Sequence, residues 1–172
     1  TGVTSITREA DYWAIAYRNG QYIKAKNVVS TLPHYALSGI LKNSSFPEFS
    51  IEYNPMLTLQ VEISTSELKS KTKGFGFLAS SFERSDFIGV MFNGNTFSTA
   101  VSGDKALMNF FVRPDHCETQ DSKKIFENLC VPLFRKWTGI DGDLKLINSR
   151  FWQQAIPQKT IGHSISLQLI KQ

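Results

Sequence analysis

The fold is decided by the stretch Met56-Leu57-Thr58-Leu59-Gln60-Val61-Glu62-Ile63-Ser64. Apolar and polar side chains alternate along it, which is the period of a β-strand with one buried face and one open face. Similar strand patterns follow at 75–79, 88–92, 106–112 and 144–152. These segments predict one mixed, mainly antiparallel sheet downstream of residue 55.

One principal helix is predicted between the last two of these strands. Asp121 supplies an N-cap, and the helix runs to about Trp137. Its apolar residues fall on one face, at positions 125, 126, 129, 130, 133 and 134. Pro132 is expected to kink or split this helix. The predicted class is α+β, with the helix packed on the sheet.

The N-terminal part reads as three strands, at 3–9, 12–18 and 21–32, with an Asn19-Gly20 hairpin turn between the last two. The third strand ends in an apolar run typical of a doubly covered parallel sheet. Pro33 ends it and opens a short helix over 34–42. The loop at 43–55 predicts a boundary between domains 1–45 and 46–172.

Composition excludes several classes of protein. The 172 residues are 41% hydrophobic and 20% charged, as in a globular protein, and no apolar run approaches the roughly 20 residues that cross a bilayer. The net charge of +4 is scattered, so no nucleic-acid partner is expected. Cys117 and Cys130 lack the spacing of a metal or redox motif and read as reduced thiols, and no metal site is predicted.

No catalytic motif is present, and no catalytic residue is assigned. In Gly74-Phe75-Gly76-Phe77-Leu78, Gly76 is expected to leave room for a flat apolar partner beside the Phe rings; the alternative is a weak edge strand whose Phe side chains are core. Phe110 and Phe111 should point to opposite faces of one strand, one to the core and the other to a pocket. Three further residues have structural interpretations: Glu83 as solvated or paired with a cation, and Trp137 and Trp152 as core.

The run from Phe151 to His163 is a rigid, shaped segment rather than a linker. Pro157 fixes φ and has no N–H to donate, and Gly162 allows conformations closed to other residues. His163 has no histidine partner at helical spacing and reads as a structural hydrogen-bonding group.

Taken in order, these motifs make the chain resemble the protoporphyrinogen oxidases, within the oxygen-dependent flavin amine oxidase superfamily. The matching segments are Val28-Val29-Ser30-Thr31-Leu32-Pro33, Gly74-Phe75-Gly76-Phe77-Leu78 with Glu83, Gly89 to Phe92, Ala155-Ile156-Pro157-Gln158 and Gly162-His163. Departures are Ser80 in place of a proline and Arg113-Pro114 in place of a Gly-Gly pair.

The resemblance implies an internal fragment, with 1–45 a strand-rich slice of an FAD-binding domain and 46–172 a substrate-binding domain incomplete at its C-terminus. The parent would oxidise protoporphyrinogen IX to protoporphyrin IX with FAD and oxygen, in heme biosynthesis. The substrate would lie against Phe75, Gly76, Leu78 and Phe111. The cofactor-binding residues stay open, with Thr31 and Pro33 as candidates.

For the parent, the resemblance further implies a tetrapyrrole ligand, a cytoplasmic location with peripheral association at the inner face of the membrane, and a homo-oligomer. The 172-residue chain alone is expected to be inactive, because the dinucleotide fingerprint that holds FAD is missing from it. Two alternatives stay open: another flavin amine oxidase or carotenoid-desaturase-like enzyme, and a non-enzymatic α+β binding domain.

Overall fold

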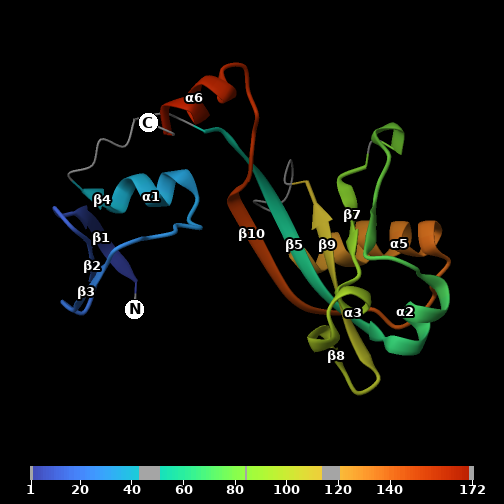
Figure 1. Cartoon of the computed structure of the whole chain (residues 1–172). Helices are drawn as coiled ribbons and strands as arrows, with labels where there is room; N and C mark the ends of the chain where they lie inside the picture. Colours follow the sequence, from blue (N-terminus) through green and yellow to red (C-terminus); the bar gives the residue numbers. More distant parts are fainter. Residues whose placement is uncertain (1, 43–50, 84, 114–120, 171–172) are drawn as a thin grey trace. The chain divides into compact units, whose positions relative to one another are not determined.

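The computed structural model describes residues 2–42, 51–83, 85–113 and 121–170 (Figure 1). Contacts divide the chain into two compact units, one of Thr1–Glu52 with Pro157–Gln172 and one of Tyr53–Ile156. The C-terminal segment thus groups with the N-terminal unit. Assignment of 1–45 and 46–172 to flavin and substrate domains stays a prediction.

The first unit contains a four-stranded sheet in the order β3-β2-β1-β4. Its elements are β1 (Val3–Arg8), β2 (Trp13–Tyr17), β3 (Tyr22–Ala25), α1 (His34–Ile40), β4 (Leu41–Lys42) and α6 (His163–Ile170). The pairs β1–β2 and β2–β3 are antiparallel, and β4 lies parallel to β1. Gly20 has a φ of 80° in the β2–β3 turn, so the predicted Asn-Gly hairpin is confirmed.

The expected strand over 21–32 is wrong beyond Ala25, where β3 ends. The apolar run that follows is irregular, and Val29 is 89% exposed. A buried parallel strand needs neighbours on both edges and cover on both faces. Within the described ranges, no strand pairs with residues 26–32, so the run has no ladder to join. Pro33 nevertheless precedes α1, as predicted, but the helix expected over 34–42 ends at Ile40, because Leu41 and Lys42 pair with β1 as β4.

The second unit is built on a six-stranded sheet in the order β10-β5-β9-β7-β6, with β8 paired to β9. Its strands and helices are β5 (Tyr53–Ser64), α2 (Thr65–Lys71), β6 (Gly76–Leu78), β7 (Phe87–Met91), α3 (Asn93–Thr96), β8 (Val101–Ser102), β9 (Lys105–Val112), α4 (Ser122–Ile125), α5 (Val131–Thr138) and β10 (Lys145–Pro157). The pairs β5–β9, β9–β7 and β7–β6 are antiparallel, which confirms the α+β class.

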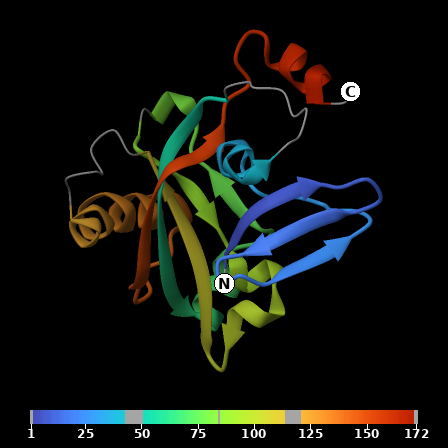
Figure 2. The same ribbon diagram turned by 90° about the vertical axis from the view of Figure 1, so that its left-hand side faces the viewer.

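Alternation along the central strands builds the core of this unit. On β9 the residues from Ala106 to Val112 are alternately buried and half-buried. The residues of β5 that pair with them alternate in the same way. The buried side chains meet those of the helical segment that lies along one face of the sheet (Figure 1, Figure 2). The deepest of them are Leu59, Ile63, Phe87, Met108, Phe110 and Phe134.

The principal helix begins where predicted but accommodates its proline without splitting. The Asp121 carboxylate accepts a hydrogen bond from the Lys123 N–H at 2.9 Å. A π-helical turn, Phe126–Cys130, joins α4 to α5, and the Val131 N–H donates to the Phe126 carbonyl five residues back. The wider turn comes directly before Pro132, whose ring would clash with a carbonyl in a regular α-helix. On the predicted apolar face, Ile125, Phe126, Cys130 and Phe134 are buried, and Leu129 and Leu133 are partly buried against the core.

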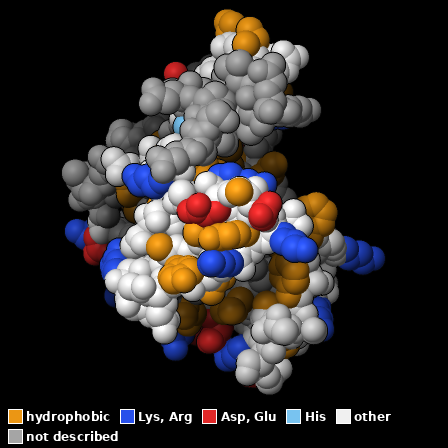
Figure 3. Space-filling view, turned by 60° about the vertical axis from the view of Figure 1, so that its left-hand side comes forward, with side chains coloured by type: hydrophobic (Ala, Val, Ile, Leu, Met, Phe, Trp, Pro, Cys, Tyr) orange, Lys and Arg blue, Asp and Glu red, His pale blue; other side chains and the backbone are white. Residues whose placement is uncertain are grey.

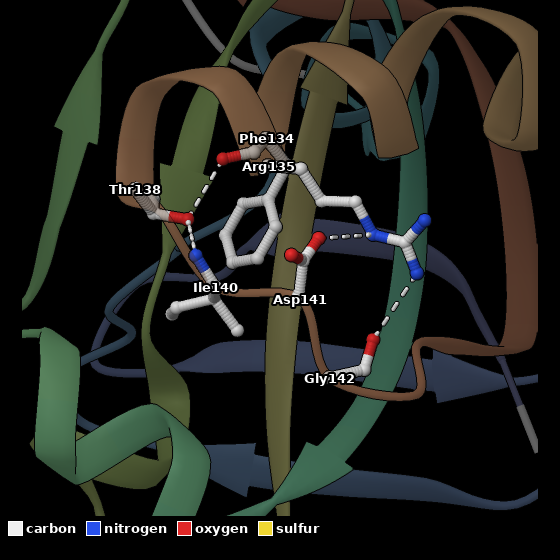
Figure 4. Close-up of polar contacts among 6 residues, drawn as sticks. All are labelled: Phe134, Arg135, Thr138, Ile140, Asp141 and Gly142. Carbon is white, nitrogen blue, oxygen red and sulfur yellow. Dashed lines mark hydrogen bonds and ion pairs between the residues drawn. The ribbon is translucent and has the colours of Figure 1, made fainter.

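The end of α5 is closed by a small set of polar contacts (Figure 4). The Thr138 hydroxyl donates to the Phe134 carbonyl at 2.7 Å and accepts from the Ile140 N–H at 3.2 Å. The Arg135 guanidinium donates to the Gly142 carbonyl at 3.4 Å. These contacts fix the turn that leads into β10, and so fix where β10 enters the sheet.

The last strand is longer than predicted. β10 continues from Lys145 to Pro157, past the expected end at 152. The Ala155-Ile156-Pro157 segment is therefore the end of a strand, where the missing N–H of Pro157 is tolerated. Gly162 has a φ of 91°, and His163 begins helix α6, which the sequence reasoning did not foresee.

Replacing Asp121 by alanine should lower the free energy of unfolding by about 1 kcal/mol, because the Lys123 N–H loses its partner at the first turn. Urea unfolding of the chain measures this. The exposed Asp143, replaced in the same way, is the matched control for loss of one carboxylate. Equal stability of Asp121→Ala and wild type would contradict the capping role.

Candidate functional site

The candidate site lies on the face of the six-stranded sheet opposite the principal helix. Because successive side chains alternate, the residues between the core positions form two rows across this face. The strand register sets one row as Leu78, Gly89, Phe111 and Thr58, and the next as Gly76, Met91, Asn109 and Gln60. Each row therefore changes from apolar to polar between β7 and β5.

The apolar half of this face holds a pocket of about 440 Å³, called here the apolar pocket. It is lined by Phe75, Gly76, Phe77, Leu78, Val90, Met91 and Phe111. All four residues that the sequence singled out for substrate contact border this one pocket. The alternative interpretation required these side chains to pack into the core. Phe75 is 73% exposed and Leu78 is 79% exposed, so neither does.

Two glycines let the strands beneath the apolar pocket approach each other. Gly76 has a φ of 153°, and a Cβ there would clash with the Val90 carbonyl oxygen and lie 3.0 Å from Met91 Cα. Gly89 mirrors it, since a Cβ there would clash with the Phe77 carbonyl oxygen. A glycine is thus required at position 76 because the backbone of β7 leaves no room for a side chain. From the sequence, the neighbouring Phe rings were expected to be the reason.

A layer of aromatic rings supports the pocket from the core side. Phe77 makes edge-on contacts with Phe92, at 6.0 Å between ring centroids, and with Trp137, at 5.8 Å. Trp137 also stacks on Phe87 at 5.5 Å and is partly buried, so it packs against the core that was predicted to contain it. Such contacts stiffen the strands that present Phe75 and Leu78.

The polar half of the same face holds a second pocket, of about 280 Å³, called here the arginine pocket. Its lining residues are Thr58, Gln60, Asn109, Asn148, Ser149, Arg150 and Trp152. The Arg150 Cζ lies 3.7 Å from the centroid of the Trp152 ring. The Trp152 indole N–H donates to the Thr58 hydroxyl at 3.1 Å, and that hydroxyl donates to the Arg150 carbonyl at 3.3 Å.

The sequence reasoning missed the arginine pocket and placed Trp152 in the core. Trp152 is 40% exposed and lies on the open face. Arg150 and Trp152 are two residues apart on one strand, which is the spacing for a shared face and was the available signal. Their meeting with Thr58 depends on strand pairing between distant segments.

A third pocket, of about 900 Å³, borders the apolar pocket at Phe75 and is called here the lysine pocket. Its lining residues are Lys69, Thr72, Lys73, Gly74, Phe75, Gly94, Asn95, Thr96, Ser98 and Val101. The Asn95 amide donates to the Thr72 hydroxyl at 3.0 Å and to the Gly74 carbonyl at 3.2 Å. These bonds tie α3 to the loop before β6.

The remaining sequence-predicted positions lie elsewhere. Thr31 and Pro33 are exposed in the first unit, next to α1. The described residues of that unit form no strand, glycine-rich turn and helix of the kind that cradles a dinucleotide pyrophosphate, so they do not by themselves fit FAD. Glu83 pairs with Lys136 at 3.8 Å, as expected. Cys130 is buried and reduced, and Cys117 lies outside the described residues.

Metal chemistry adds no competing site in the part of the chain that the structure describes. That part contains no group of three His, Cys, Asp or Glu side chains placed to hold a metal ion. No described helix is long and apolar enough to cross a membrane. Basic side chains are dispersed among hydrophobic and acidic ones on the face shown in Figure 3.

One family model and two solved structures are similar to the chain. The model of the flavin containing amine oxidoreductases matches residues 1–168. A provisionally assigned protoporphyrinogen oxidase from Exiguobacterium sp. 255-15 is similar in structure, with a TM-score of 0.60 and 18% identity over 98% of this chain. Reduced UDP-galactopyranose mutase gives a TM-score of 0.60 and 13% identity, also over 98% of this chain.

At these identities the two structures show the fold alone. The chain covers 37% of each of them, a little over a third of their length. Comparison with functionally curated proteins gives no significant match.

Proposed function

The chain belongs to the family of flavin containing amine oxidoreductases, and from this premise we propose that it forms the substrate-binding surface of a flavoprotein oxidase. The observation that carries the proposal is the apolar pocket. Phe75 and Leu78 are exposed there, at the edge of the sheet where Gly76 and Gly89 let two strands approach closely. Large apolar side chains held outward around a concave surface are typical of ligand sites.

The finer proposal is that the substrate is protoporphyrinogen IX and the product protoporphyrin IX, with FAD and oxygen completing the reaction. A large apolar macrocycle suits the lining of the apolar pocket, which consists of aromatic, aliphatic and glycine residues and contains no charged side chain. When bound, the flavin supplies the redox chemistry. The part assigned to this chain is to bind the ring, orient it and keep water from its face.

The experiment that tests this proposal measures protoporphyrinogen IX oxidation by the complete protein, followed by protoporphyrin fluorescence. Replacing Phe75 by alanine should raise KM by roughly tenfold to a hundredfold, because about 1.5–3 kcal/mol of apolar contact is lost in ground state and transition state alike. The value of kcat should change little. Thermal stability should also change little, because the ring is mostly exposed in the free protein.

The matched control is Phe82→Ala. Phe82 is 94% exposed and is absent from the lining of the apolar pocket, so its loss should leave KM unchanged. Parallel losses of stability and activity in Phe75→Ala would assign Phe75 to packing instead. Absence of protoporphyrinogen oxidation by the flavin-loaded complete protein would refute the finer proposal.

A second candidate is another oxidase of the family, of the amine-oxidising or carotenoid-desaturase-like kind, since an apolar pocket also suits those substrates. Turnover of protoporphyrinogen IX, an amine and a carotenoid precursor, measured side by side, distinguishes them. The match of residues 1–168 to the family favours either oxidase over a non-enzymatic binding domain.

A further inference from the structure

We propose that the arginine pocket is an anion subsite that binds a carboxylate of the substrate whose apolar body lies in the apolar pocket. The inference rests on the proposed function and deepens it. It names the substrate class as apolar ring compounds that carry an acidic group at one edge.

Arg150 is positioned by its neighbours in a way that suits anion binding. Trp152 stacks on its guanidinium at 3.7 Å, and Thr58 holds the indole through a hydrogen bond of 3.1 Å from β5. Stacking fixes the plane of the guanidinium but leaves its N–H edge available, because the donors lie in that plane. A preorganised fork loses less conformational entropy when it binds a carboxylate.

Among the described residues, the lining of the arginine pocket contains no carboxylate that would compete for Arg150. Its pocket is lined by amides and hydroxyls from Thr58, Gln60, Asn109, Asn148 and Ser149, without a carboxylate. Across the described ranges, the three ion pairs of the chain involve other cations, and the contacts of Arg150 are with Trp152 and, through its backbone, Thr58. The guanidinium therefore has its charge-assisted hydrogen bonds still to make.

The strand register makes the apolar and arginine pockets neighbours on one face of the sheet. Phe111 of the apolar pocket is directly opposite Thr58 of the arginine pocket, and Met91 is directly opposite Asn109. Two interstrand spacings, roughly 10 Å, separate the strand of Phe111 from that of Arg150. A ring system over Phe111 with a carboxylate on a short side chain spans this distance.

The two pockets together imply discrimination between substrates. A purely apolar ligand fills the apolar pocket, and the Arg150 guanidinium then stays hydrated. An acidic ligand also accepts paired N–H hydrogen bonds from Arg150 at its carboxylate. Arg150 is exposed, and an exposed ion pair contributes little through charge alone, so the gain depends on the paired N–H bonds of a positioned guanidinium. We therefore expect Arg150 to affect acidic ligands selectively, and most at low ionic strength.

The test uses the complete protein and two probes of the same shape, protoporphyrin IX and its dimethyl ester, titrated by fluorescence in one detergent buffer. Replacing Arg150 by glutamine should weaken binding of the free acid about threefold to fivefold and leave the ester unchanged. Arg150→Lys should recover part of the affinity, since it keeps the charge but loses the fork. Thr58→Val should weaken the free acid less, because Thr58 is a positioning residue.

The matched control is Lys124→Gln, which removes one exposed positive charge from α4, on the other face of the sheet. An equal loss of free-acid binding in Lys124→Gln would assign the effect to net charge and overturn the inference. Equal weakening of acid and ester by Arg150→Gln, or no weakening of either, would also overturn it. Sodium acetate should compete only weakly, whereas full displacement of the free acid by acetate would show a general anion site instead.

Failure of the proposed function gives a different result. If Phe75→Ala leaves both probes bound as in wild type, the apolar pocket is not the site and the proposed function fails. If Phe75→Ala weakens both probes while Arg150→Gln changes neither, the proposed function stands and the anion subsite fails.

Discussion

Replacing Gly76 by valine is expected to cost on the order of 3 kcal/mol of unfolding free energy and to abolish ligand binding at the apolar pocket. A side chain there would clash with the Val90 carbonyl oxygen of the neighbouring strand and lie 3.0 Å from Met91 Cα. Backbone cannot move aside as a flexible side chain can, so β6 must leave β7. The strand that carries Leu78 would then lose its position.

The matched control is Gly103→Val. Gly103 also has a positive φ, of 61°, but a Cβ there has no heavy atom within 4 Å. Its replacement should cost about 1–2 kcal/mol for the left-handed conformation alone. Urea unfolding of both variants separates the two costs. Equal destabilisation of Gly76→Val and Gly103→Val would show that close approach of the strands does not require Gly76.

The neighbouring residues Phe110 and Phe111 are expected to give opposite results. Phe110 is 0% exposed and packs on Phe87 and Phe134, each at 5.2 Å between centroids, so Phe110→Ala should cost about 3–5 kcal/mol. Phe111 borders the apolar pocket, so Phe111→Ala should cost about 1 kcal/mol of stability and weaken protoporphyrin IX binding roughly tenfold.

Urea unfolding and a protoporphyrin IX titration of both variants measure these effects. Phe111→Leu, which keeps an apolar side chain at the pocket, serves as the conservative control. A loss of stability in Phe111→Ala as large as in Phe110→Ala would place both rings in the core and remove Phe111 from the site.

Features set by local pattern could be predicted from the sequence. The alternation from Met56 to Ser64 gave the face of β5, and the Phe110-Phe111 pair gave one core ring and one pocket ring. Asp121 was recognisable as a cap because its bond is to a residue two positions away. Such features depend on few neighbours, so the chain itself contains the information.

Features that depend on distant partners could not be predicted. The Val28 to Leu32 run has strand composition but no strand beside it in the described chain. Trp152 reads as a core residue until its partner Thr58 is known to lie 94 positions away. The role of Gly76 likewise depends on the Val90 carbonyl, which only the β6–β7 register places over it.

The central claim is that the open face around Phe75, Leu78 and Phe111 binds the substrate of a flavoprotein oxidase. The most direct measurement is a crystal structure of the complete protein with protoporphyrin IX bound. We expect the macrocycle within about 4 Å of these three side chains, with a carboxylate toward Arg150. A structure in which the three side chains pack against other parts of the protein, with the ligand bound elsewhere, would contradict the claim.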